Sequence, residues 1–447
     1  MKSMLTNPRT ARHRSSFEIM GADRVTEVVA AARRATTGWA GLATADRSRR
    51  IWHLAAAIED RADVFVAAEQ AGTGKPRHEA EAEIAECIDL LRFYAGVVRG
   101  DLTPGSGHRL ADRESWVRWE PLGVVAAIVP WNYPLLMAVW RCAPALAAGN
   151  TVVLKPAETT PDSVLLAAEC AAEALGPGVL TVATGDRDTG RILVEAAVDA
   201  VAFTGSPVGG LDVASRGGLR RVSLELGGNC PAIVLPDAPD ETYVSLARAS
   251  TLNAGQSCAA PARVITLPDQ YDTVVSRLGD AMRERRAGVD FGPLNNTDQA
   301  ARFDAILDRS TAKIRHCGPT AVSPDESEGY WRPSIVLADL DPEDPAVREE
   351  VFGPVLTVQR AESLEDAVAL ANGVSQALAA SVWGRDVGQI MRIARVLSAG
   401  EVWVNCHLEQ TGDLPHGGRK QSGNGTDLSV LALAEYQRPK TITVNIS

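Results

Sequence analysis

A helical pattern gives way to a β-like run in the stretch Asn253-Ala254-Gly255-Gln256-Ser257-Cys258-Ala259-Ala260-Pro261-Ala262-Arg263-Val264, and one cysteine stands in the turn between them. Residues 243–253 are Ala-rich with helical spacing, and residues 263–267 are β-like. A thiol on such a loop can meet a substrate, whereas a thiol inside a helix usually packs as a small hydrophobic group. Most single cysteines are buried and inert, so Cys258 alone does not establish a nucleophile.

A glutamate 33 residues upstream changes this interpretation. It begins the motif Glu225-Leu226-Gly227-Gly228, which ends another β-like run. The carboxylate and the thiol both lie beside glycines, which allow the backbone to approach a ligand closely. If the fold brings them together, they can act as general base and nucleophile.

Length, composition and net charge limit the classes of protein to which this chain can belong. The chain has 447 residues, which predicts two or three domains rather than one core. Hydrophobic residues make up 45% and charged residues 23%, as in ordinary globular proteins. The net charge is −11 and Lys and Arg form no run, so nucleic acid is not an expected partner.

The cysteine pattern favours a reducing compartment. The seven cysteines are an odd number and widely scattered, and neither a CxxC pair nor a Cys/His cluster with zinc spacing occurs. We therefore expect no disulfide framework and no metal site. The N-terminus lacks the apolar core of a signal peptide, and no stretch has the length and hydrophobicity of a membrane span. A cytoplasmic protein without a membrane partner is expected.

The flanking segments predict mixed structure. Residues 1–17 are expected to be loosely attached, and residues 22–100 have helical spacing. Residues 72–76, Gly-Thr-Gly-Lys-Pro, resemble a phosphate loop but lack its first glycine and its Ser/Thr, so we expect a turn between helices. Residues 101–119 and 440–444 are isolated extended segments, which are expected to pair with each other or with another subunit.

The rest of the chain alternates between apolar β-like runs and helical patterns. This alternation predicts parallel sheets covered on both faces, in two α/β units with a crevice between them. The first series of expected strands is 124–129, 151–154, 180–184, 200–204 and 222–226, with helices near 135–146, 162–174, 190–197 and 208–216. The second series of strands is 232–235, 263–267, 355–360, 378–382 and 401–405.

Three motifs at strand ends have a functional and a structural interpretation each. Residues 203–210, Phe-Thr-Gly-Ser-Pro-Val-Gly-Gly, can bind phosphate at a helix N-terminus or simply start a helix. Lys155 and Glu158 can bind ribose hydroxyls or form an exposed charged pair at a turn. Asn132, in Pro130-Trp131-Asn132-Tyr133-Pro134, can stabilise an oxyanion or cap a helix.

Taken together, seven motifs resemble the NAD(P)-dependent aldehyde dehydrogenase superfamily in order and spacing. They are residues 130–134, 155–158, 203–210, 224–228, 255–258, 350–355 and 417–423. The resemblance covers residue 22 to the C-terminus, and residues 407–427 are most similar to the aminobutyraldehyde and betaine aldehyde dehydrogenase branch.

The resemblance implies two side-by-side open α/β domains, one Rossmann-like for the cofactor and one catalytic, with a small β oligomerisation ribbon. Residues 1–100 and 120–226 would bind NAD, residues 227–425 would form the catalytic domain, and residues 101–119 and 436–447 would form the ribbon. A homodimer or homotetramer is expected.

The resemblance also implies a role for each matching residue. Cys258 would attack a small-molecule aldehyde to give a thiohemiacetal, with the oxyanion held by the Asn132 side chain and the Cys258 N–H. Hydride transfer would leave a thioester, which Glu225 would hydrolyse by activating water. The implied cofactor-binding residues are Trp131, Lys155, Glu158, Gly205, Ser206, Glu350 and Phe352. The implied substrate-tunnel residues are Tyr133, Met137 and Trp140, for which plain core packing is the alternative.

Cofactor and substrate preferences follow from charge. Glu158 would accept hydrogen bonds from a free 2′-hydroxyl and repel a 2′-phosphate, which favours NAD over NADP. Glu409 and Asp413 lie in the loop expected at the tunnel mouth, where they could attract an amino-aldehyde such as 4-aminobutanal or merely be solvated.

The sequence also departs from the family pattern. Asn229 replaces a usual Lys, Pro207 replaces a usual Thr, the segment 283–291 is shortened, and the family's N-terminal strands are expected to be largely missing. Because of these departures, an alternative function remains open, in which the chain is a catalytically inactive relative of the family that serves as a binding or structural protein. A CoA-acylating enzyme is disfavoured because the hydrolytic base Glu225 is present.

Overall fold

The computed structural model describes residues 2–100 and 107–447, and its first residues form a hairpin. Strand β1 (Lys2–Thr6) pairs antiparallel with β2 (His13–Glu18). The expectations of a loosely attached residues 1–17 and of missing N-terminal strands are therefore wrong. The hairpin is fixed by ion pairs from Arg9 to Glu326 and from Arg14 to Asp162, 317 and 148 residues away along the chain. Local patterns carry no information about such distant partners.

The helical pattern of residues 22–100 is confirmed by four helices. They are α1 (Ala22–Ala40), α2 (Thr44–Glu59), α3 (Ala62–Thr73) and α4 (Arg77–Val97). The helix α3 ends at Gly74, whose φ of 76° lies in the left-handed region that favours glycine. Residues 72–76 thus form a turn between helices, as predicted.

A five-stranded parallel sheet follows, with strand order β7-β6-β5-β8-β9. Its strands are β5 (Val124–Ile128), β6 (Thr151–Lys155), β7 (Leu180–Val182), β8 (Ala200–Thr204) and β9 (Arg221–Glu225). Its helices are α5 (Pro134–Ala147), α6 (Asp162–Ala174), α7 (Arg187–Glu195) and α8 (Pro207–Gly217). Helices α1, α7 and α8 cover one face, while α5 and α6, backed by α2–α4, cover the other. The predicted two-sided coverage is confirmed.

A seven-stranded sheet forms the second unit, with strand order β12-β13-β14-β11-β10-β16-β17. Its strands are β10 (Cys230–Val234), β11 (Pro261–Thr266), β12 (Ile314–Cys317), β13 (Ile335–Ala338), β14 (Val355–Arg360), β16 (Ala379–Trp383) and β17 (Glu401–Val404). Its helices are α9 (Glu241–Thr251), α10 (Pro268–Arg283), α11 (Thr297–Asp308), α12 (Pro345–Arg348), α13 (Leu364–Asn372) and α14 (Val387–Val396). The pairing of β12 with β13 is antiparallel and all others are parallel.

Short elements complete the connections. They are the two-stranded pair of β15 (Gln376–Ala377) with β18 (Arg419–Lys420) and the 3-10 helices η1 (Leu252–Gly255), η2 (Pro324–Glu326) and η3 (Val430–Tyr436).

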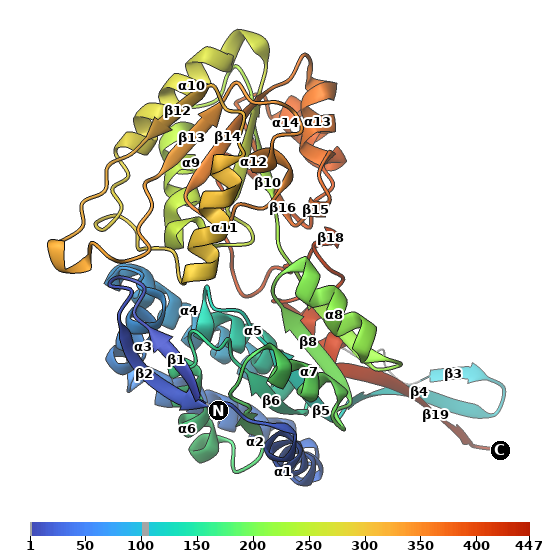
Figure 1. The fold of residues 1–447 in the computed structure, drawn as a ribbon. Coiled ribbons are helices and arrows are strands. Elements are labelled where there is room, and N and C mark those ends of the chain that lie inside the picture. Colours follow the sequence, from blue (N-terminus) through green and yellow to red (C-terminus); the bar gives the residue numbers. More distant parts are fainter. Residues whose placement is uncertain (1, 101–106) are drawn as a thin grey trace.

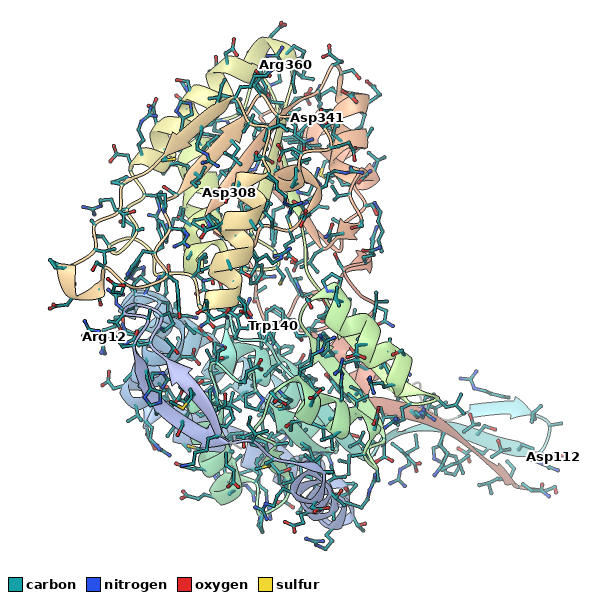
Figure 2. All side chains as sticks on the ribbon, viewed as in Figure 1. Arg12, Asp112, Trp140, Asp308, Asp341 and Arg360 are labelled. Carbon is teal, nitrogen blue, oxygen red and sulfur yellow. The ribbon has the colours of Figure 1, made fainter. Side chains whose placement is uncertain are left out.

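The two isolated extended segments pair with each other, as one of the two alternatives predicted. Strand β4 (Arg113–Pro121) runs antiparallel to β19 (Gln437–Asn445) over nine residue pairs, and β3 (Gly107–Leu110) adds a third strand. The expected ribbon residues 101–106 lie outside the described residues. The ribbon extends away from both α/β units, and Asp112 marks its far end (Figures 1 and 2).

The two α/β units stack along the long axis of the molecule, with α9–α14 in one unit and α1–α8 in the other (Figure 1). Segments from both units meet at their junction, including the loop after β5 and the loop before β11, which contact through hydrogen bonds. Within residues 2–100 and 107–447, no helix combines the length and the apolar character that crossing a membrane requires.

Candidate active site

The loop that carries Cys258 begins with an unusual backbone. Asn253, Ala254 and Gly255 have consecutive φ angles of 49°, 57° and 71°, all in the left-handed region. Such strain persists only where surrounding structure fixes it, and it is common at functional sites. Gly255 is required here because a Cβ would collide with the carbonyl of Gly353. The chain therefore turns sharply between α9 and the cysteine.

Hydrogen bonds join this loop to the loop that carries Asn132. The Asn132 Nδ2 donates to the carbonyl of Gln256 at 2.9 Å, and the Asn253 Nδ2 donates to the carbonyl of Asn132 at 2.8 Å. The Asn132 Oδ1 is buried and has no hydrogen-bond partner in the described part of the chain. The structure thus brings two predicted site residues, Asn132 and Cys258, into one interface and leaves the amide only partly satisfied.

Cys258 is half-buried, unlike Cys87, Cys142, Cys170 and Cys230, which are fully buried. Burial raises the pKa of the thiol well above its ordinary value, and the charges of Glu350 and Glu225 raise it further. The backbone N–H of Cys258 acts in the opposite direction and lowers the pKa of the thiol. The neutral thiol is therefore the resting form at neutral pH, and its proton must leave before sulfur can act as a nucleophile.

The Gly227-Gly228 pair allows Glu350 and Cys258 to approach the same backbone. The Gly228 N–H donates to Glu350 Oε1 at 3.0 Å. A Cβ at Gly227 would collide with the Glu350 carboxylate, and one at Gly228 would collide with the Cys258 carbonyl. Burial raises the pKa of Glu350 to about 7. The glycines after Glu225 are thus explained by close packing at the site.

Glu225 lies at the end of β9 with its carboxyl group buried. Neither of its oxygens has a hydrogen-bond partner within residues 2–100 and 107–447, and Gly417 and Gly425 flank one of them. Burial raises its pKa well above the ordinary value, the charge of Asp427 adds to this, and Arg141 opposes it. No hydrogen bond joins Glu225 to Cys258 among the described residues, although its charge acts on the thiol. An unpartnered buried carboxyl is typical of a functional site.

Arg141 and Asp427 are site residues that the sequence reasoning missed. Arg141 Nη1 lies 3.0 Å from Asp427 Oδ1, an ion pair too oblique for a hydrogen bond, and both side chains are fully buried. Arg141 also donates to Thr204 Oγ1 at 2.8 Å. A single Arg inside the apolar helix Leu-Leu-Met-Ala-Val-Trp-Arg-Cys-Ala is the signal that could have revealed it, because an unpaired buried charge is costly.

The three predicted tunnel residues follow one another along α5, at its N-cap and within its first two turns. Tyr133 is half-buried, and Met137 and Trp140 are buried on α5. The Trp140 ring packs edge-on against His416 with centroids 5.1 Å apart, and His416 Nδ1 lies 3.0 Å from Glu401 Oε2. Glu409 and Asp413 are both exposed.

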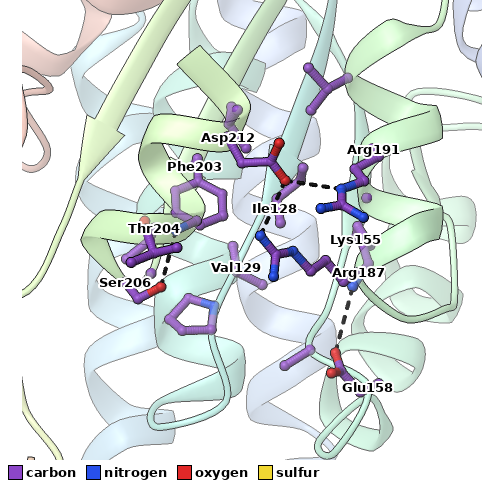
Figure 3. Close-up of a pocket in the computed structure, with 18 of the residues that line it drawn as sticks. Ile128, Val129, Lys155, Glu158, Arg187, Arg191, Phe203, Thr204, Ser206 and Asp212 are labelled. Atoms are coloured by element: carbon purple, nitrogen blue, oxygen red, sulfur yellow. Dashed lines mark hydrogen bonds and ion pairs between the residues drawn. The ribbon is translucent and has the colours of Figure 1, made fainter. Parts of the chain in front are cut away.

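A cavity of about 330 Å³ lies at the carboxyl ends of β5, β6 and β8. The strand order reverses between β5 and β8, which is where open α/β sheets bind dinucleotides. Five of the predicted cofactor-binding residues line it, namely Trp131, Lys155, Glu158, Gly205 and Ser206. Figure 3 shows Lys155, Glu158 and Ser206 around it. Glu350 and Phe352 do not line it, but the Phe352 ring packs edge-on against Trp131 with centroids 5.5 Å apart.

The lining of this cavity fits a dinucleotide. Ser206 caps α8 by accepting from the Gly209 N–H at 3.2 Å, which places the positive end of this helix dipole at the cavity, where a phosphate is favoured. Lys155 is buried with its Nζ 4.0 Å from Glu158 Oε2, and burial lowers its pKa. The sequence reasoning missed the cavity's three arginines, Arg187, Arg191 and Arg216, which all pair with Asp212.

Comparison with known proteins agrees with this geometry. The family model of the Aldehyde dehydrogenase family matches residues 2–442. Human aldehyde dehydrogenase 1A1 is 35% identical over 99% of this chain and 91% of its own length. Human retinaldehyde dehydrogenase 3 is 35% identical over 95% of this chain and 85% of its own length.

A solved structure of betaine aldehyde dehydrogenase from Staphylococcus aureus in complex with NAD⁺ has a TM-score of 0.95. It is 29% identical, and the match covers 100% of this chain and 92% of that one. These matches span both α/β units and every motif above. The chain therefore belongs to the NAD(P)-dependent aldehyde dehydrogenase family.

Proposed function

We propose that the protein oxidises an aldehyde to a carboxylic acid with NAD, using Cys258 as nucleophile, Asn132 as oxyanion donor and Glu225 as general base. One observation carries this assignment: Asn132 and the Cys258 loop are joined by hydrogen bonds, close to an unpartnered buried carboxyl and to the cavity at the carboxyl ends of β5, β6 and β8. The family membership of the chain supports the same reaction.

The first step forms a covalent adduct. The Cys258 thiol gives its proton to solvent water and its sulfur bonds to the aldehyde carbon, while the carbonyl π electrons move to oxygen to give a thiohemiacetal oxyanion. The Asn132 amide carries two N–H bonds, and only one is directed at Gln256. The second N–H and the Cys258 backbone N–H would stabilise the oxyanion.

The second step is oxidation and hydrolysis. When bound, the cofactor supplies the acceptor for the hydride that leaves the carbon, and a thioester remains on Cys258. Glu225 takes a proton from water, the water oxygen attacks the thioester carbon, and the acid and the thiolate separate. Free acid as product distinguishes this route from transfer to CoA.

For the cofactor, we propose that Lys155 and Glu158 bind the adenosine ribose. Gly205 and Ser206 would bind the pyrophosphate, Glu350 the nicotinamide ribose, and Trp131 and Phe352 would flank the cofactor. Glu158 disfavours the 2′-phosphate of NADP by charge repulsion, which makes NAD the preferred cofactor.

For the substrate, we propose an amino-aldehyde such as 4-aminobutanal, held along Tyr133, Met137 and Trp140. Glu409 and Asp413 are exposed in the loop that follows β17, and their negative charges would attract a cationic substrate. The test compares kcat/KM for 4-aminobutanal and butanal with both cofactors. A value several-fold higher for the amine supports the proposal, and equal values contradict it.

At the level of organisation, we propose that residues 1–100 and 120–226 form the NAD-binding domain and residues 227–425 the catalytic domain. The ribbon of residues 101–119 and 436–447 would join subunits in a homodimer or homotetramer.

The second candidate function is a catalytically quiet binding or structural protein. One of its two reasons, the missing N-terminal strands, no longer holds, since β1 and β2 are present. The other reason, Asn229, has a packing role: its Nδ2 donates to the carbonyl of Val347 at 2.7 Å. NAD binding without NADH formation across a panel of aldehydes would favour this candidate.

A further inference from the structure

Lys75, in the turn between α3 and α4, contacts the proposed active site although the sequence indicates only a turn there. Its side chain is 1% exposed and its Nζ forms an ion pair with Glu83. The same Nζ donates to the backbone carbonyl of Asn132 at 3.2 Å and lies 4.5 Å from the centroid of the Tyr133 ring. One ammonium group therefore contacts the backbone of the proposed oxyanion donor and a proposed substrate residue.

Three buried glutamates surround Lys75, and together the four residues form what we term the Lys75 cluster: Glu69, Lys75, Glu79 and Glu83. Glu69 Oε1 accepts from the N–H of Leu135 at 3.1 Å, and Glu83 Oε1 accepts from the N–H of Leu136 at 3.4 Å. These N–H groups belong to the first turn of α5, where a helix offers no internal partner. The cluster therefore caps the helix that follows Asn132.

The cluster also reaches the loop of the nucleophile. Glu79 Oε2 accepts from the backbone N–H of Asn253 at 3.1 Å, and Asn253 donates to the Asn132 carbonyl. Both loops of the site are thus anchored on the corner between α3 and α4. Burial raises the pKa of Glu69 to about 8 and that of Glu79 to about 7, so protonation limits the net negative charge of the cluster near neutral pH.

We propose that Lys75 is a positioning residue that orients the Asn132 amide toward the oxyanion through its hydrogen bond to the Asn132 carbonyl. This inference rests on the proposed function of Asn132. The backbone carbonyl oxygen of Asn132 accepts two hydrogen bonds, one from Lys75 Nζ and one from Asn253 Nδ2. With its backbone fixed there and one side-chain N–H held by Gln256, the remaining N–H has little freedom. Small displacements of such a donor have large effects on rate.

The test uses the double variant Lys75→Met/Glu83→Gln. It removes both charges of the ion pair, while the amide oxygen introduced by Glu83→Gln can still accept from Leu136. Toward the active site, the donation to Asn132 and the cation over Tyr133 are lost, and the opposite effects of Lys75 and Glu83 on the pKa of Glu69 and Glu79 are removed together. We expect kcat/KM for the aldehyde to fall roughly 10- to 100-fold. The Kd for NAD and the rate of Cys258 alkylation by iodoacetamide, which forms no oxyanion, should stay within about twofold of wild type.

The decisive comparison repeats the double variant in an Asn132→Ala background. Since Lys75 acts through Asn132, we expect no further loss there. A loss of equal size in both backgrounds, or a parallel loss of alkylation rate, would overturn the inference. A wild-type protein that forms no NADH from any aldehyde would instead refute the proposed function.

A second variant covers the case in which the double variant does not fold. Asn253→Gly removes the other donor to the Asn132 carbonyl and tolerates the φ of 49°. The same loss of kcat/KM and the same absence of effect in the Asn132→Ala background are expected. The matched control is Lys313→Met/Asp339→Asn, which removes an exposed Lys–Asp pair of 3.3 Å and should leave kcat/KM unchanged.

Discussion

Cys258 and Glu225 share one electrostatic property, since burial raises the pKa of both groups. The thiol and the carboxyl group are therefore both favoured in their neutral forms. A negative charge on Glu225 makes the thiolate of Cys258 harder to form, and a thiolate makes Glu225 harder to ionise. A thiol and a carboxyl that are both neutral at rest avoid two adjacent buried charges. The thiolate and the ionised base are then needed at different steps of the proposed reaction, attack first and hydrolysis later.

The pH dependence of the reaction should respond to Asp427. A general base works when ionised, so kcat should rise with pH through the raised pKa of Glu225. The Asp427→Asn variant removes a negative charge that raises this pKa and leaves Arg141, which lowers it. We expect the rising limb of the kcat–pH profile to move to lower pH. The control Asp308→Asn, a substitution on the exposed end of α11, should not move it, and a limb unmoved in Asp427→Asn would contradict this role.

Individual residues were predictable from sequence only where a motif marked them. Cys258, Glu225 and Asn132 stand in glycine- or proline-bounded motifs at strand ends. Arg141, Asp427 and Lys75 stand in a helix interior, a loop and a turn, and their importance comes from partners distant in sequence. Burial of a charge is a property of the fold, and no local pattern contains it.

At the scale of elements, the buried Glu79 at the corner between α3 and α4 lowers the stability of the fold in a pH-dependent way. The pKa of Glu79 is raised by burial from 4.5 to about 7. Between these values the folded chain keeps a proton that the unfolded chain has lost, so the free energy of unfolding falls as pH rises through this window. Above about pH 7, Glu79 is ionised in both the folded and the unfolded chain, and the stability lost by burying its charge no longer changes with pH.

Glu79→Gln should remove this cost while its amide oxygen still accepts from Asn253. We expect the Tm of the variant, relative to wild type, to increase from about pH 5 to about pH 8. The underlying gain is about 3 kcal/mol. Thermal unfolding followed at several pH values measures it. A Tm difference that is constant or shrinks with rising pH would show that Glu79 is ionised throughout.

Elements were predictable where apolar runs alternated with helical spacing. The strands β8 and β14 and the helix α6 have the predicted bounds. Strands β12 and β13 were missed. β12, Ile-Arg-His-Cys, is the antiparallel edge strand of its sheet and contains charged and polar residues, so no apolar run marks it. The hairpin of β1 and β2 was missed because ion pairs to distant residues hold it in place.

At the scale of the whole molecule, the three-stranded ribbon has a strand edge that nothing within the described part of one chain covers. In the described residues β19 pairs only with β4, so its other edge is free, and Val444 and Ile446 are 42% and 50% exposed. Free edges with exposed apolar side chains are normally covered by another chain.

We expect light scattering to give a mass of two or four subunits for the wild type. Val444→Glu/Ile446→Glu should reduce this mass at least twofold, since charges replace apolar contacts. The control Val387→Glu alters a more exposed apolar residue on α14, 69% exposed, and should leave the mass unchanged. A monomeric wild type, or a ribbon variant of unchanged mass, would remove the ribbon's proposed role.

The most direct test of the central claim is a single turnover of Glu225→Gln with an aldehyde and NAD, followed by mass spectrometry. Cys258 should still attack and hydride should still leave, but without the base the thioester should persist. We predict a burst of about one NADH per site, an acyl group on the peptide containing Cys258, and steady turnover reduced roughly 100-fold or more. An unmodified Cys258 after the burst, or steady turnover equal to wild type, would contradict the account.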